Sequence, residues 1–120
     1  MDSDIQDACN QVYKVLGPGH SEVTYHKALE VEFRERQIPY ESERVVPIVY
    51  KDHTIGYFRL DFVVRSNCIV ELKAMTCNLR TEERMQLGNY QKVLGIPKGI
   101  LVNFRQKPDT DVEFIFMDNT

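Results

Sequence analysis

The sequence has little of what marks membrane, secreted or cysteine-rich proteins. No run of apolar residues approaches the roughly 18 that a bilayer-spanning helix needs. The first residues, MDSDIQDACNQ, are acidic and polar and do not resemble a secretory signal. The chain has 3 cysteines and no CxxC pair, which argues against a disulfide scaffold, a zinc ribbon and an iron–sulfur cluster. We therefore expect a cytoplasmic protein without a membrane partner.

The sequence also lacks an overall excess of positive charge. Its 15 Lys and Arg face 18 Asp and Glu, a formal net charge of −3, which argues against a generally basic nucleic-acid coat protein. The charge is unevenly distributed, because residues 59–107 carry nine basic and four acidic side chains. This positive stretch could face a polyanion while the acidic remainder faces water. Scattered, solvated charge explains the same counts and stays open as the alternative.

The length and the hydrophobic periodicity predict a single α/β domain, residues 1–120. Two separate cores in 120 residues would each be close to the size at which folding is marginal. We expect helices at 4–16, 21–37 and 82–94, and strands at 45–50, 55–65, 68–74, 98–104 and 112–117. The element order is therefore ααβββαββ. The helix between the third and fourth strands implies that these two strands pair in parallel.

Local signals place the ends of these elements. Ser3 and Thr81 are expected to cap the first and third helices, and Gly95 to end the third helix. Pro47 indicates that the first strand lies at a sheet edge or contains a bulge. The second strand alternates, and its pattern predicts that four apolar side chains share one face: Phe58, Leu60, Phe62 and Val64.

The third strand carries charges where a buried strand should have none. Its neighbours make it the expected central strand, yet Glu71 and Lys73 occupy its middle and share one face. Asp61 is a further acid in the preceding strand. Asp61 and Glu71 are symmetric about the turn at residues 66–67, so they could face each other within about 5–8 Å.

Two carboxylates at that separation repel each other unless one is protonated or a cation lies between them. Oxygen ligands suit a hard divalent cation such as Mg²⁺. The structural alternative is a buried Glu71–Lys73 ion pair, with Asp61 bonded to a backbone group or to Arg59. Burying such a pair rarely stabilises a fold, which favours the metal.

These residues resemble those of a known nuclease group. Asp61, followed on the next strand by Glu71-Leu72-Lys73, is similar to the signature of the PD-(D/E)xK nuclease superfamily. Gly19-His20-Ser21-Glu22-Val23-Thr24-Tyr25 matches the motif that names the GxxExxY protein family. The resemblance extends over about residues 12–117 and includes 59–62, 70–74 and 86–90. It implies a restriction-endonuclease-like core, with a mixed central β-sheet flanked by helices.

The resemblance implies a metal-dependent nuclease that hydrolyses phosphodiester bonds of nucleic acid, with DNA favoured. Its catalytic residues would be Glu22, Asp61, Glu71 and Lys73. Asp61 and Glu71 would bind Mg²⁺ or Mn²⁺, with the backbone carbonyl of Leu72 as a further ligand and Glu22 reaching the metal directly or through water. Lys73 would orient the attacking water and stabilise the charge that develops on the phosphate.

Three further residues would support the site. Gln86 and Tyr90 are four residues apart on the third helix and resemble the QxxxY element of exonuclease-like members, which holds the site and the nucleic-acid strand. Tyr25 would pack beneath the site. Ordinary structural roles remain open for Glu22 in offsetting the helix dipole, for Gln86 as an exposed helix former, and for Tyr90 as a core aromatic.

The remaining histidines and cysteines receive no functional role. His20, His26 and His53 lack metal-ligand spacing, and we expect them to fill surface or core positions. Cys9 and Cys68 are expected to be small apolar core residues.

Two other functions fit the same resemblance. One is a catalytically inactive relative that binds nucleic acid or a protein partner. The other is a dimeric, junction-type resolvase. Because the chain is little more than the core of such a fold, a homodimer or a larger protein partner would extend its binding surface.

Overall fold

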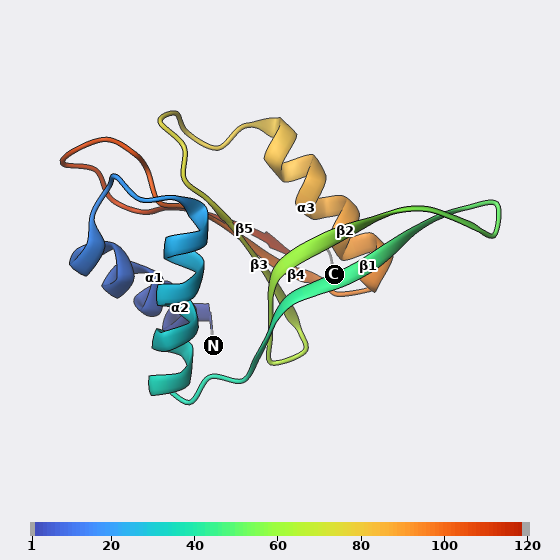
Figure 1. Ribbon diagram of the computed structural model, residues 1–120, viewed down its shortest axis with the longest axis horizontal. Coiled ribbons are helices and arrows are strands. Elements are labelled where there is room, and N and C mark those ends of the chain that lie inside the picture. Colours follow the sequence, from blue (N-terminus) through green and yellow to red (C-terminus); the bar gives the residue numbers. More distant parts are fainter. Residues whose placement is uncertain (1, 119–120) are drawn as a thin grey trace.

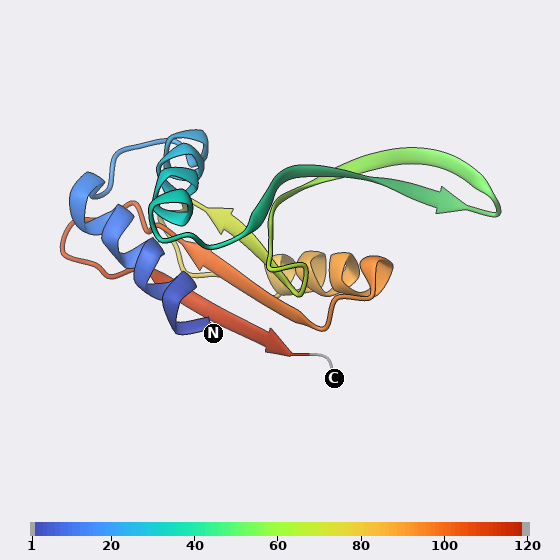
Figure 2. The same ribbon diagram turned by 90° about the horizontal axis from the view of Figure 1, so that it is seen from below.

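The computed structural model describes residues 2–118, and its elements follow the expected order, ααβββαββ. The helices are α1 (Asp2–Leu16), α2 (Glu22–Glu35) and α3 (Thr81–Leu94), and the strands are β1 (Tyr40–Tyr50), β2 (His53–Val64), β3 (Cys68–Lys73), β4 (Lys98–Asn103) and β5 (Glu113–Asp118). The sheet lies between α1 and α2 on one side and α3 on the other (Figures 1 and 2). This is the α/β class expected for a restriction-endonuclease-like fold.

The five strands form one mixed sheet in the order β1-β2-β3-β4-β5. Only β3 and β4 of these described strands pair in parallel, as the intervening helix α3 predicts. The charged strand β3 is the central one, and β1, which contains Pro47, lies at an edge as expected. Beyond the helices, β1 and β2 continue as a long projecting hairpin (Figure 1).

Each face of the sheet has its own apolar core. Beneath α1 and α2 the core includes the buried side chains of Tyr25, Phe33 and Phe104, together with Cys9 and Cys68 as predicted. Beneath α3 a second core contains five buried residues from the sheet and one from the helix: Val46, Leu60, Val63, Ile69, Leu101 and Leu87. Because both faces are covered, the middle of the sheet is buried on both sides. No helix within residues 2–118 is long and apolar enough to cross a membrane.

Two of the predicted helix caps are wrong. Ser3 lies inside α1, which begins at Asp2. Arg80, not Thr81, is the N-cap of α3, because the Glu83 carboxylate accepts the Arg80 backbone N–H at 2.7 Å and so satisfies a donor at the helix start. Gly95 does end α3, in the left-handed conformation with φ 66°.

The predicted alternation of β2 is also wrong. Phe62 and Val64 pack beneath α1 and α2, whereas Phe58 and Leu60 pack beneath α3. The change of face occurs at Asp61, where the regular pairing between β1 and β2 skips one residue on each strand. The skipped residue of β1, Glu43, has φ 57°, a conformation rare in residues other than glycine. Because of this irregularity, the apolar side chains before Asp61 and those after it lie on opposite faces of the sheet.

The ends of several other elements differ from the sequence-based ranges by one or two residues, and β1 begins five residues earlier than expected. Residues 40–44 at its start are mostly polar and little buried, so the sequence there lacks the apolar pattern that predicts a strand. These residues nevertheless pair with β2 from Tyr40 opposite Val64 onward.

Candidate active site at the end of the β2–β3 hairpin

Asp61 and Glu71 meet where the β2–β3 pairing ends. The last regular pair is Phe62 with Val70, so Asp61 and Glu71 face each other one step further on. The Asp61 backbone N–H donates to Glu71 Oε1 at 2.9 Å, and the Leu72 backbone N–H donates to Asp61 Oδ2 at 2.8 Å. Each carboxylate thus satisfies a backbone donor that the diverging strands leave unpaired.

This geometry supports one part of the structural alternative, the backbone bond of Asp61, and contradicts the other part, the Glu71–Lys73 ion pair. Asp61 does accept a backbone N–H, as that alternative expected. Glu71 and Lys73, however, form no ion pair within the described residues, and the Lys73 ammonium contacts Gln86 instead. The two adjacent charges of β3 therefore have different partners.

Glu71 is a buried acid beside a second acid. Its residue surface is only 6% exposed. Burial raises the pKa of Glu71 to about 8, and the charge of Asp61 adds to the increase. The hydrogen bond from the Asp61 N–H and the charge of Lys73 act in the opposite direction without cancelling it. A proton or a cation at this position would relieve the repulsion between the two carboxylates.

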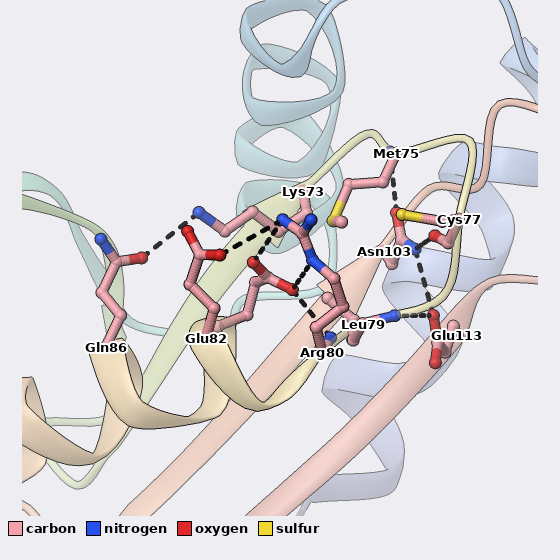
Figure 3. A network of polar contacts seen from close by, with 10 residues as sticks. Lys73, Met75, Cys77, Leu79, Arg80, Glu82, Gln86, Asn103 and Glu113 are labelled. Carbon is pink, nitrogen blue, oxygen red and sulfur yellow. Dashed lines mark hydrogen bonds and ion pairs between the residues drawn. The ribbon is translucent and has the colours of Figure 1, made fainter.

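Helix α3 places Gln86 and Tyr90 on the same side of β3. Lys73 Nζ lies 3.3 Å from Gln86 Oε1 (Figure 3). The Tyr90 ring, one turn along the helix, stacks on Phe58 with a centroid distance of 4.2 Å. Burial raises the pKa of Tyr90, and the charges of Glu71 and Asp61 raise it further. Tyr90 therefore lies close enough to the two acids to be affected by their charge, whereas Gln86 contacts Lys73.

Helix α2 brings Glu22 to the site from the other side. Partial burial raises the pKa of Glu22, the charge of Lys73 lowers it, and that of Asp61 raises it. Glu22 and Asp61 also line one cavity of about 150 Å³ together with five further residues: Val23, His26, Lys27, Glu30 and Glu43. Ser21 caps the helix, accepting the Thr24 N–H at 3.4 Å, and so fixes where Glu22 starts the first turn.

Tyr25 lies in the core rather than among the acids. Its ring stacks on Phe104 with a centroid distance of 4.4 Å. Its hydroxyl donates to the Gly17 carbonyl at 2.6 Å and accepts from Gln106 Nε2 at 3.0 Å. Gln106 Oε1 in turn accepts the Gly19 N–H at 2.7 Å. Tyr25 thus anchors the turn that leads into α2 and positions Glu22 indirectly.

His26 lies at the site, which the sequence analysis did not predict. Its Nδ1 is 3.4 Å from Asp61 Oδ1, and its Nε2 is 2.8 Å from Ser42 Oγ. Burial lowers the pKa of His26, but the hydrogen bond and charge of Asp61 and the charge of Glu30 leave it raised. The available signal was spacing, because His26 follows Glu22 by four residues and shares its helix face.

Asn103 also went unnoticed, and it holds the chain that follows Lys73. Asn103 is fully buried at the end of β4, opposite Lys73 in the parallel register. Its Oδ1 accepts the Met75 N–H at 3.0 Å, and its Nδ2 donates to the Cys77 carbonyl at 3.0 Å and to Glu113 Oε1 at 3.1 Å (Figure 3). A polar residue ending an apolar strand was the only sequence signal.

The residues present fit a divalent metal held mainly by two carboxylates. Within residues 2–118, no three or more His, Cys, Asp and Glu side chains form a cluster that could hold a metal ion. Mg²⁺, however, commonly uses only one or two protein carboxylates and completes its shell with water and phosphate oxygens. Asp61 and Glu71 supply such a pair, and their mutual repulsion favours a cation.

Comparisons with known proteins identify the superfamily and the fold of the chain. A family model described as the PD-(D/E)XK nuclease superfamily matches residues 1–115. No curated protein matches the chain. The solved crystal structure of SSO0001 is similar in fold, with a TM-score of 0.65 and 21% sequence identity over 82% of this chain and 50% of that chain. The chain therefore spans half the length of that protein.

Proposed function

Because the chain belongs to the PD-(D/E)XK nuclease superfamily, we propose that it hydrolyses phosphodiester bonds of nucleic acid, with DNA favoured, in a reaction that requires Mg²⁺ or Mn²⁺. The observation that carries the proposal is the pair of hydrogen bonds that joins Asp61 to Glu71 and Leu72, with Lys73 directly following. Within the superfamily, we propose membership of the GxxExxY family on the motif at residues 19–25.

Asp61 and Glu71 would hold the metal ion. The Leu72 carbonyl would be a further ligand, and Glu22 would reach the metal directly or through water. A metal held there would lower the pKa of a bound water and would offset negative charge on the phosphate. The buried position of Glu71 supports this role, because burying a carboxylate beside a second acid costs free energy even though it accepts the Asp61 N–H.

Lys73 would orient the attacking water and stabilise the charge that develops on the phosphate. Its contact with Gln86 holds the ammonium on the α3 side of the sheet. Gln86 and Tyr90 would then help to hold the nucleic-acid strand across that side. Tyr25 would act from the core, through the turn that it anchors before Glu22.

The nucleic-acid partner is supported by the net positive charge of residues 59–107, which contribute β3, α3 and β4. We propose that association into a homodimer or with a larger protein would extend this surface.

The test combines metal binding with cleavage. We would titrate Mn²⁺ into wild type and Glu71→Gln by calorimetry, and then assay single-stranded, double-stranded and branched DNA together with RNA. We expect Glu71→Gln to lose measurable Mn²⁺ binding and to lower cleavage by about 100-fold or more, without lowering the thermal midpoint. Glu82→Gln, an exposed glutamate on α3, is the matched control and should resemble wild type.

The variant Lys73→Ala separates metal binding from catalysis, since we expect it to bind Mn²⁺ but to lose cleavage. Wild type that binds Mn²⁺ yet cleaves none of these substrates would favour the catalytically inactive, nucleic-acid-binding alternative. A strong preference for a four-way junction, with a dimer in solution, would favour the resolvase instead.

A further inference from the structure

The His26 side chain on α2 contacts three residues of the neighbouring strands: Phe62 and Asp61 on β2, and Ser42 on β1. The residue is 7% exposed, and its ring stacks on Phe62 with a centroid distance of 4.2 Å and an interplanar angle of 15°. One ring nitrogen faces Asp61, and the other faces Ser42 on β1. Stacking and polar contacts at both nitrogens leave the ring little freedom to rotate.

The partners of His26 also favour one arrangement of its protons. A carboxylate can only accept a hydrogen bond, so the contact with Asp61 Oδ1 is favourable when Nδ1 carries a proton. The Ser42 hydroxyl can either donate or accept, and therefore complements Nε2 in either state. Ser42 thus orients the ring without competing for the proton that faces Asp61.

The two oxygens of Asp61 are consequently held from opposite sides. Oδ2 accepts the Leu72 N–H of β3, and Oδ1 faces His26 of α2. At Asp61 the pairing of β2 with β1 is interrupted, so the strand ladder alone does not fix this residue. The imidazole therefore restrains the side chain where the backbone gives least support.

We propose that His26 is a positioning residue, which holds Asp61 in the orientation that binds the divalent metal. The inference deepens the proposed nuclease function and rests on it. Groups that hydrogen-bond to a ligating carboxylate typically change metal affinity by about 10- to 100-fold when they are removed. His26 acts through Asp61 and is not itself a metal ligand in this proposal.

The test measures the affinity for Mn²⁺ alone by calorimetry. We expect His26→Leu to weaken Mn²⁺ binding by about 10-fold or more, because it keeps an apolar contact with Phe62 but removes the donor. His26→Asn, which retains an N–H donor near the Nδ1 position, should recover much of the loss. Ser42→Ala should weaken binding less. His53→Leu, a change of an exposed histidine, is the matched control and should leave Mn²⁺ affinity unchanged.

A second measurement separates this inference from the proposed function. In chelator, a double-mutant cycle of His26→Leu and Asp61→Asn on chemical denaturation should give a nonzero coupling between the two side chains. No coupling, or Mn²⁺ affinity of His26→Leu within about twofold of wild type, would overturn the positioning role alone. Wild type that binds no Mn²⁺ would overturn the proposed function, whatever the cycle shows. Should His26→Leu fail to fold, His26→Gln takes its place, because its amide lies nearer the Nε2 than the Nδ1 position and so removes the donor to Asp61. Wild-type Mn²⁺ affinity in His26→Gln would then contradict the proposal.

Discussion

The end of the sheet near Lys73 and the projecting β1–β2 hairpin depart from the usual rule of burial in opposite directions. Near Lys73, the polar side chains of Glu71, Glu83 and Asn103 are buried. In the hairpin, apolar side chains are exposed, and Tyr57 reaches 68%. The first region includes the start of α3, and Asn103 in it contacts the loop that precedes α3. The hairpin, in contrast, extends beyond the helices (Figure 1).

The difference shows that covering layers, and not side-chain polarity alone, decide burial in this fold. A buried polar group costs free energy unless it has a partner, and Asn103 and Glu83 both have several. Exposed apolar side chains carry no such cost, but they also contribute little to stability. Substitutions in the two regions should therefore differ sharply in their effect.

The largest effect is expected at Asn103. Replacing it by leucine leaves the Met75 N–H and the Cys77 carbonyl without their buried partner. We expect Asn103→Leu to lower the free energy of unfolding by about 2–4 kcal/mol in urea denaturation. Asn89→Leu, on the exposed side of α3, is the matched control and should change it by less than about 0.5 kcal/mol. Equal effects at both positions would mean that the buried network does not stabilise the fold.

Part of the fold could be predicted from the sequence, and part could not. The element order, the parallel β3–β4 pair and the end of α3 at Gly95 follow from periodicity and local chemistry, and the structure confirms them. The faces of β2 do not follow, because an irregularity at Asp61 depends on the unusual backbone of Glu43 in a neighbouring strand. Prediction from periodicity assumes a regular strand, so it cannot detect a change of face within the strand.

The candidate site was predictable to a similar extent. Symmetry about the hairpin turn was sufficient to bring Asp61 and Glu71 together, and their close contact is present. His26 was missed because metal-ligand spacing identifies only direct ligands. His26 on α2 instead contacts Asp61 on β2, which is distant in the sequence. Asn103 was missed because its partners lie in the backbone of a distant loop, which has no sequence signature.

A smaller effect is expected from the charge of Glu83. The hydrogen bonds from Arg80 hold the pKa of Glu83 below its usual value of 4.5. A carboxyl group whose folded-state pKa is lowered stabilises the protein above its unfolded-state pKa, and this contribution is lost as the pH falls through the folded-state pKa. Wild type should therefore lose thermal stability below about pH 4.5 more steeply than Glu83→Gln, which keeps a neutral cap. Parallel melting curves of the two proteins from pH 6 to about pH 3 would contradict this.

The smallest effect is expected at Tyr57 in the hairpin, and the adjacent aromatic residue Phe58 provides the contrast. Tyr57 is exposed, whereas Phe58 stacks on Tyr90 and packs into the core beneath α3. We expect Tyr57→Ser to change the free energy of unfolding by less than about 0.5 kcal/mol, and Phe58→Ser to lower it by about 1–3 kcal/mol. Urea denaturation of the two variants measures the contrast between neighbours on opposite faces of one strand. A loss of more than about 1 kcal/mol for Tyr57→Ser would show that the outer face of the hairpin is covered in solution, and the contrast between the two regions would then no longer hold.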